Sequence, residues 1–231
     1  MMNRRTIRFA FAVSTVCLTG ILTALTVAPA HAFVAGPNEL SAQLKVQLHK
    51  HLAEGGIPLD VQESLIAKME AGKQLDSFTG AAPIESFIDE TADMPQTVSV
   101  FADGSRRITA VELPADAGAA RTGLSGCVSS SGWKINCKIS VWDPISSAKF
   151  TIDYQTSTSS KAKVRSFRGA SCAVVGIPSS CSLPSPTGIA RAAQSSAGSA
   201  WARVTYKAQS GPLHAKGEFG IRVTGTNVSV Y

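Results

Sequence analysis

The sequence predicts an α+β protein, and three observations lead to this prediction. Between residues 40 and 69, apolar residues recur every three or four positions, as on the buried side of an α-helix. An Asp-Gly pair stands between two short apolar runs at residues 103–104. Beyond residue 130, apolar and polar residues alternate in several short segments, which is the pattern of half-buried β-strands. We therefore expect helices first and an antiparallel β region after them.

The first 32 residues have the pattern of a secretory signal peptide. Three arginines lie among the first eight residues, a mostly apolar run extends from Phe9 to Val27, and Ala-His-Ala at 30–32 is a small-x-small cleavage site. A run of this length is also compatible with an uncleaved membrane anchor, but the cleavage site favours a signal peptide. We expect a secreted, extracellular protein that begins at Phe33, with no transmembrane span after cleavage.

Two apolar stripes in residues 33–113 predict a helical hairpin. The first stripe has leucines at positions 40, 44, 48 and 52, and the second has apolar residues at 61, 65, 66 and 69. Gly55-Gly56 and Pro58 separate the two stripes and indicate where the first helix ends. The whole region is acidic, and its two helices are expected to pack against each other.

The Asp103-Gly104 pair predicts a β-hairpin at the end of this acidic region. Residues 97–101 and 106–111 flank the pair with alternating apolar residues, and Asp-Gly suits the tight turn of a two-stranded hairpin. The following segment, 114–123, is rich in Ala and Gly and has few large side chains. We interpret it as a linker to a second domain, residues 124–231.

Residues 124–231 are predicted to form an antiparallel β-sandwich. The alternating segments that indicate its strands are 135–141, 150–154, 202–206, 219–223 and a last one at 228–230. Several short strands with turn signals between them are typical of an immunoglobulin-like sandwich. The apolar set must face inward, because a shift of one residue would bury the charged set instead.

Four cysteines remain after the expected cleavage, and all lie in the β region: Cys127, Cys137, Cys172 and Cys181. An even number of cysteines in an exported protein indicates disulfide bonds. Three pairings are formally available, and the close spacings favour Cys127–Cys137 and Cys172–Cys181. A metal site does not fit the spacing, since there is no C-x-x-C and only His214 is near. We predict no metal and no other cofactor.

The charge is unevenly divided between the two regions. Residues 33–119 contain six Lys and Arg and thirteen Asp and Glu, whereas residues 120–231 contain thirteen basic residues and three acids. Such a basic region prefers an anionic partner. The candidate binding residues occupy outward strand positions or a basic run between strands: Lys134, Lys138, Lys163, Arg165, Arg203 and Lys207.

Two of the expected strands each carry a pair of these residues, four positions apart. Lys134 with Lys138, and Arg203 with Lys207, are each expected to point to one face, because side chains alternate along a strand. The sequence does not decide whether all of the basic residues meet on one sheet. The three tryptophans, Trp133, Trp142 and Trp201, are candidates for stacking on sugars, with at least one expected in the core.

We predict no catalytic residues. A serine hydrolase of this chain needs His49, His51 or His214 as its base, and there is no G-x-S-x-G motif. His49 and His51 lie two residues apart, so they point to different sides of a helix and are expected to be solvated. Asp143 and Asp153 are interpreted as ordinary surface acids rather than the carboxylate pair of a glycosidase.

Most of the secreted chain resembles exported proteins of actinobacteria. The resemblance rests on residues 36–77, on the phrase TVSVFADGSRRITAVELP at 97–114 and on the four-cysteine β region. It implies export and brings no catalytic residues. The β region is also similar in size and cysteine number to the two-disulfide inhibitors of subtilisin-like proteases from these bacteria. The segment 172–178 lacks the reactive-loop pattern of those inhibitors.

These observations predict an exported, non-catalytic binding protein whose partner is an anionic polymer of the cell wall or an acidic polysaccharide. No specific recognition of nucleic acid is expected. Two alternatives stay open: a secreted hydrolase, and a secreted protease inhibitor that uses the 172–181 loop.

Overall fold

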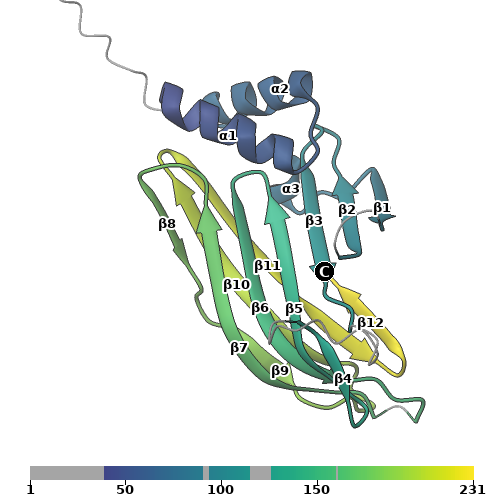
Figure 1. Ribbon diagram of the computed structural model, residues 1–231. Helices are drawn as coiled ribbons and strands as arrows, with labels where there is room; N and C mark the ends of the chain where they lie inside the picture. Colours follow the sequence, from purple (N-terminus) through teal and green to yellow (C-terminus); the bar gives the residue numbers. More distant parts are fainter. Residues whose placement is uncertain (1–38, 91–93, 115–125, 160) are drawn as a thin grey trace, which may run out of the picture. The chain divides into compact units, whose positions relative to one another are not determined.

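The computed structural model describes residues 39–90, 94–114, 126–159 and 161–231 (Figure 1). Residues 35–231 form one compact unit. The predicted signal peptide, the Phe33 start and nearly all of the predicted linker lie outside the described residues. In the part of the chain that the structure describes, no helix is long and apolar enough to cross a membrane.

Helices are present at both predicted apolar stripes. They are α1 (Ala42–Glu54) and α2 (Leu59–Glu70), followed by the short α3 (Asp76–Thr79). The hydroxyl of Ser41 accepts a hydrogen bond from the Leu44 amide at 3.2 Å, which satisfies one of the free amides at the start of α1. The apolar sides of α1 and α2 are buried in the same hydrophobic cluster as the strands. The helices therefore close one end of the β-sheets (Figure 1).

The first sheet contains seven strands among the described residues, in the order β1-β2-β3-β5-β6-β7, with β4 paired to β5. All pairs are antiparallel. Its strands are β1 (Glu85–Asp89), β2 (Gln96–Val100), β3 (Arg106–Val111), β4 (Val128–Ser130), β5 (Trp133–Asp143), β6 (Ser146–Gln155) and β7 (Lys163–Val174).

The second sheet contains five strands of the described ranges, in the order β12-β11-β10-β8, with β9 also paired to β10. Its strands are β8 (Ser179–Ser182), β9 (Gly188–Arg191), β10 (Ala200–Ser210), β11 (Leu213–Thr224) and β12 (Asn227–Val230). The two sheets share one core, in which the rings of Phe150 and Phe219 lie 5.4 Å apart. The fold is therefore β-sandwich-like, as predicted. The strand order does not confirm the immunoglobulin-like class, whose strands are connected as Greek keys.

One β-ladder crosses the predicted boundary between the two regions. Strand β3, from the acidic region, pairs with β5 of the β region, from Ile108 opposite Trp142 to Val111 opposite Ile139. Buried leucines of α1 and α2 also belong to the hydrophobic cluster of the sandwich. The two predicted regions are thus joined by backbone hydrogen bonds and by a common core.

Both favoured disulfide pairings are confirmed. Cys127–Cys137 lies beside the β4–β5 hairpin, with its Cα atoms 4.2 Å apart. Cys172–Cys181 joins β7 to β8, and therefore connects the first sheet to the second. The two bonds have different roles, since one fixes a hairpin and the other fixes the sandwich.

The long strand β7 was missed by the sequence pattern. Its pairing with β6 shifts register twice. One shift lies between Arg165 and Arg168, and the other lies between Arg168 and Ser171. Ser166 and Gly169 have positive φ values of 54° and 61° at these shifts. Each bulge adds a residue and reverses the alternation of side chains, so no strand periodicity is visible in this segment of the sequence.

Candidate functional site

The outer face of the first sheet is polar and basic where β5, β6 and β7 build it. Along β5 and β6 the residues that face the core are buried, among them Ile139, Val141 and Phe150. The alternate residues face outward. Those of β5 are Lys138, Ser140 and Trp142, and those of β6 are Ser147, Lys149, Thr151, Asp153 and Gln155.

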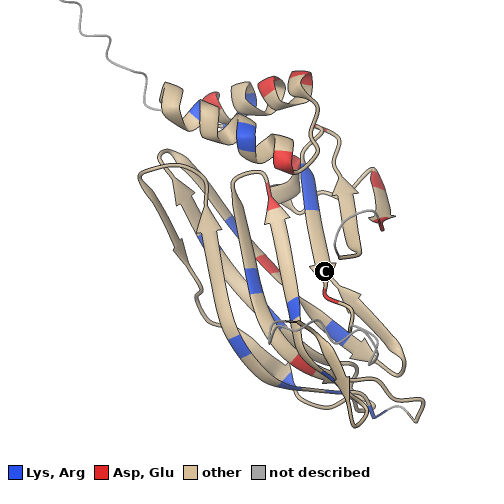
Figure 2. Ribbon diagram, viewed as in Figure 1, with Lys and Arg blue, Asp and Glu red and all other residues tan. Residues whose placement is uncertain are grey.

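The strand registers arrange these outward side chains in rows across β5, β6 and β7. The rows are Trp142–Ser147–Ala173, Ser140–Lys149–Ser171 and Lys138–Thr151–Arg168, followed by Asp153–Arg165 and Gln155–Lys163. The face extends from Ser147 to Gln155 of β6, which is eight steps or about 26 Å at the usual rise of a strand. Figure 2 shows Lys and Arg spread along these strands, while most Asp and Glu lie on the helices and near β1.

The first rows form the floor of a groove of about 510 Å³. Small side chains, among them Ala110, Ser140 and Ser147, make up much of this floor, so the groove is open above the sheet. Lys138 and Lys149 also line it, and Trp142 and Glu54 line it near α1. We call this feature the groove.

Apart from Glu54, whose carboxylate lies 3.6 Å from the His51 ring, several polar groups of the groove have no partner in the described chain. Within the described ranges, the ammonium groups of Lys138 and Lys149 have no ion-pair partner. The hydroxyls of Ser140, Ser147 and Ser171 likewise make no hydrogen bond to the described part of the chain. Two cations beside three hydroxyls can bind a ligand with anionic groups and further oxygen atoms.

Beyond the groove, the same face continues into a cluster around Asp153. The Asp153 carboxylate lies 3.0 Å from Arg168 and 3.5 Å from Arg165, and it accepts a hydrogen bond from the Asn136 amide. Burial by itself raises the pKa of Asp153, but the amide and Arg168 outweigh it, and the pKa is lowered. Arg165 also lies 3.8 Å above the ring of Trp133.

Asn136 and Ser166 stand on either side of Asp153 with positive φ values of 62° and 54°. The bulges at these two residues orient the Asn136 amide, Arg165 and Arg168 toward the Asp153 carboxylate. Asp153 therefore fixes the two arginines, and Arg168 also donates to the Ser166 carbonyl and the Asn136 side chain.

Three of the six predicted binding residues lie on this face: Lys138, Lys163 and Arg165. Lys134 does not. The bulge in β5 pairs Lys134 with Tyr154, which is buried in the core, whereas Lys138 pairs with Thr151, which faces outward. The expectation that Lys134 and Lys138 share a face is therefore wrong.

The other two predicted residues, Arg203 and Lys207, lie on β10 in the second sheet. They do share a face, because β10 pairs with β11 without a register shift between these two residues. The six residues thus form no single patch.

The groove residues Lys149, Ser140, Ser147 and Ser171 were not among the candidates. The predicted alternation placed Ser140 and Lys149 outward, whereas Ser147 lies before the predicted strand at 150–154. Only the pairing with β7 brings Ser171 beside Lys149.

All three tryptophans are partly exposed and all three contact a charged or titratable side chain. Trp142 stacks on His51 of α1, with ring centroids 4.8 Å apart, and its indole lies where a Cβ atom of residue 55 would stand. Only glycine fits at position 55, so α1 can end against Trp142. His51 also hydrogen-bonds the carbonyl oxygen of Asp143 at 2.9 Å. His49 bonds Gln62, so the two histidines are not simply solvated as expected.

The geometry gives no support to the hydrolase alternatives. Asp143 and Asp153 are both buried rather than surface acids; Asp153 is on the outer face but lies against Arg165 and Arg168. Their positions on the β5–β6 hairpin are seven residues apart. That corresponds to about 23 Å along a strand, more than twice the spacing of a glycosidase pair. His214 lies opposite Gln209 and makes no hydrogen bond or ion pair in the described chain.

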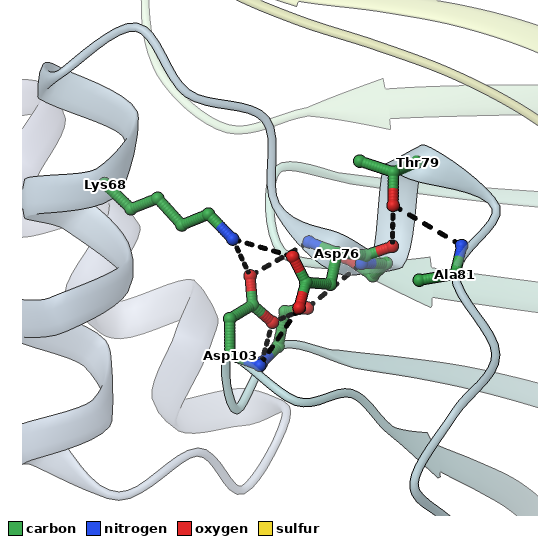
Figure 3. Close-up of polar contacts among 7 residues, drawn as sticks. Lys68, Asp76, Thr79, Ala81 and Asp103 are labelled. Carbon is green, nitrogen blue, oxygen red and sulfur yellow. Dashed lines mark hydrogen bonds and ion pairs between the residues drawn. The ribbon is translucent and has the colours of Figure 1, made fainter.

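Figure 3 shows a second polar cluster, which joins α2, α3 and the β2–β3 hairpin. The Lys68 ammonium lies 2.7 Å from Asp76 and 2.8 Å from Asp103. Asp103 also accepts hydrogen bonds from Ser105 and from the amide of Asp76. The charged groups of Lys68, Asp76 and Asp103 all have partners within the fold, so we interpret this cluster as structural.

No family model, curated protein or solved structure matches this chain. Among the described residues, no group of three or more His, Cys, Asp or Glu side chains could hold a metal ion.

Proposed function

We propose that this protein is an exported, non-catalytic binding protein for a linear anionic polymer, either a phosphate-linked wall polymer or an acidic polysaccharide. The binding surface is the outer face of the first sheet. The observation that carries the proposal is the groove, in which two unpaired lysines stand beside three unpaired serine hydroxyls.

The arrangement of the face supports a long ligand rather than a small one. From the groove, cationic side chains continue in register along β7, through Arg168 and Arg165 to Lys163. A linear polymer can follow this direction and place repeated negative groups near successive cations. The serine hydroxyls provide hydrogen bonds to sugar or phosphate oxygens, and Trp133 and Trp142 flank the two ends.

The test compares two variants that lose the same net charge. The first replaces three lysines of the face, K138Q/K149Q/K163Q, and the second replaces three lysines elsewhere, K50Q/K73Q/K134Q. Retention of the secreted protein is measured on immobilised teichoic acid, polygalacturonate and nucleic acid over a series of salt concentrations. Each lost phosphate contact reduces the salt slope by about 0.7–0.9.

We expect the first variant to lose about two to three units of salt slope on the preferred polymer and the second to behave like the wild type. Equal losses in both variants would mean that net charge alone drives retention. Absence of wild-type retention at low salt would contradict the proposal. Comparable retention on nucleic acid would contradict the preference for a wall polymer or polysaccharide.

One observation favours protease inhibition as a second candidate. The segment between Cys172 and Cys181 is closed by a disulfide, and Ile177 within it is 79% exposed. The Gly211 amide donates to the Pro178 carbonyl, and Gly176 packs where a Cβ atom would overlap Leu44. A protease inhibitor presents a side chain to the enzyme on a fixed loop, and this loop could present Ile177 in that manner. Titration of subtilisin-like proteases with wild type and Ile177→Ala tests this candidate, which fails if neither protein inhibits.

A further inference from the structure

The second sheet has a basic outer face of its own. On β10 and β11 the residues that face the core are buried, among them Ala202, Val204 and Ile221. The outward residues stand opposite one another as Trp201–Arg222, Arg203–Gly220, Thr205–Glu218 and Lys207–Lys216. Arg191 of β9 stands on the other side of Trp201. We call this the β10–β11 face; its charged residues are Arg191, Arg203, Lys207, Lys216, Glu218 and Arg222.

Lys207 and Lys216 are directly opposite each other in the ladder. Both are exposed, and neither forms an ion pair in the described residues. Like charges at this position of an antiparallel pair destabilise the sheet. The ladder therefore keeps two cations opposite each other without a compensating charge, and a bound anion would relieve their repulsion.

Two of the three arginines of this face lie against aromatic rings. Arg222 lies 4.5 Å from the ring of Tyr231, and Arg203 lies 4.9 Å from that of Trp201. Glu218 forms an ion pair with Arg203 at 3.1 Å, which leaves Arg222 exposed with its charge uncompensated. A guanidinium stacked on a ring loses less freedom when it binds an anion.

This face and the outer face of the first sheet point in opposite directions, because the shared core lies between the sheets. A polymer segment lying along the first sheet would not contact the β10–β11 face. We propose that the β10–β11 face is a second binding surface for the same class of polyanion, so that one molecule bridges two polymer chains. This inference rests on the proposed function.

The experiment measures bridging separately from binding. Increasing amounts of the secreted protein are added to soluble teichoic acid or polygalacturonate, and light scattering is recorded. A bridging protein gives a maximum of scattering near equivalence, followed by a fall when excess protein occupies each chain separately. The variant K207Q/K216Q/R222Q should still be retained on the immobilised polymer, while its scattering maximum falls at least several-fold. The control K50Q/K73Q/K134Q, with the same net charge, should scatter like the wild type.

A single substitution separates a binding role of Lys216 from a structural one, because it should raise the stability of the protein and weaken bridging at the same time. Lys216→Glu replaces the repulsive pair by an attractive one, so the unfolding temperature of the free protein should rise by about 1–3 °C. Its scattering maximum should fall at the same time. Wild-type scattering in the triple variant or in Lys216→Glu would overturn the second surface while leaving the first intact. Failure of the wild type to bind the immobilised polymer would instead defeat the proposed function itself.

Discussion

The ammonium group of Lys68 on α2 lies 2.8 Å from the carboxylate of Asp103, at the turn of the β2–β3 hairpin. Burial raises the pKa of Asp103, but hydrogen bonds from Lys68, Ser105 and the Asp76 amide outweigh it and leave the pKa below its usual 3.8. The hydrogen bonds to Asp103 and Asp76 in turn raise the pKa of Lys68. This pair connects the helices to the first sheet.

The first prediction concerns acid stability. A carboxyl group whose pKa is lowered by folding contributes stability above its unfolded pKa, and this contribution is lost as pH falls through the folded value. We expect the free energy of unfolding to decrease below about pH 4, and this decrease to be smaller in Asp103→Asn. Lys68→Met should cost about 1–3 kcal/mol at pH 7 and less at pH 3. Urea unfolding at both pH values measures the effect, with Lys50→Met as control. An equal cost at both pH values would contradict the assigned role.

The second prediction concerns the buried carboxylate of Asp143. It accepts hydrogen bonds from the Tyr206 hydroxyl at 2.7 Å and from the Ser146 hydroxyl and amide. Burial raises the pKa of Asp143 despite these donors. Tyr206→Phe removes a donor to a fully buried carboxyl group and should destabilise the protein by about 1–3 kcal/mol. Tyr154→Phe is the matched control, since Tyr154 is buried without a hydrogen bond to the described chain. Similar costs for the two variants would mean that the hydroxyl on Asp143 contributes little.

The third prediction concerns the covalent framework. We expect the secreted protein to begin at Phe33 and to have no reactive thiol, because all four remaining cysteines are paired. Intact-mass measurement with and without reduction checks both points. The two bonds join residues ten and nine positions apart, and removing either one as a Cys→Ser pair should cost about 2.7 kcal/mol in the chain-entropy treatment. A thiol in the unreduced protein, or a retained leader, would disagree with this prediction.

The fourth prediction concerns the segment 114–123. Its composition predicts tryptic cleavage at Arg121, but the ladder between β3 and β5 and the common core should keep the two fragments associated. Both disulfides lie on the C-terminal side of this site, so no covalent bond joins the fragments. Size-exclusion chromatography after cleavage should give one peak in buffer and two in denaturant. Separation of the fragments in buffer would support two independent domains instead.

Much of the fold can be predicted from local patterns. The stripes of α1 and α2, the Asp103-Gly104 hairpin and the alternation in β5, β6, β10 and β11 each depend on residues close in sequence, and each was found. Strand β7 was not found, because its bulges at Ser166 and Gly169 break the alternation. Lys134 was placed on the wrong face for the same reason. A bulge changes which residues face outward, and the sequence does not mark where one occurs.

The sequence alone determined the apolar stripes, the half-buried strands, the uneven charge and the favoured cysteine pairing. These properties follow from neighbours within about a dozen residues, where spacing and side-chain chemistry are sufficient. Only the tertiary structure decided that β3 pairs with β5, that Ser171 lies beside Lys149, and that Arg203 lies on a different sheet from Lys138. The physical reason is strand register: backbone hydrogen bonds between distant segments set which side chains become neighbours, and the groove consists of such neighbours.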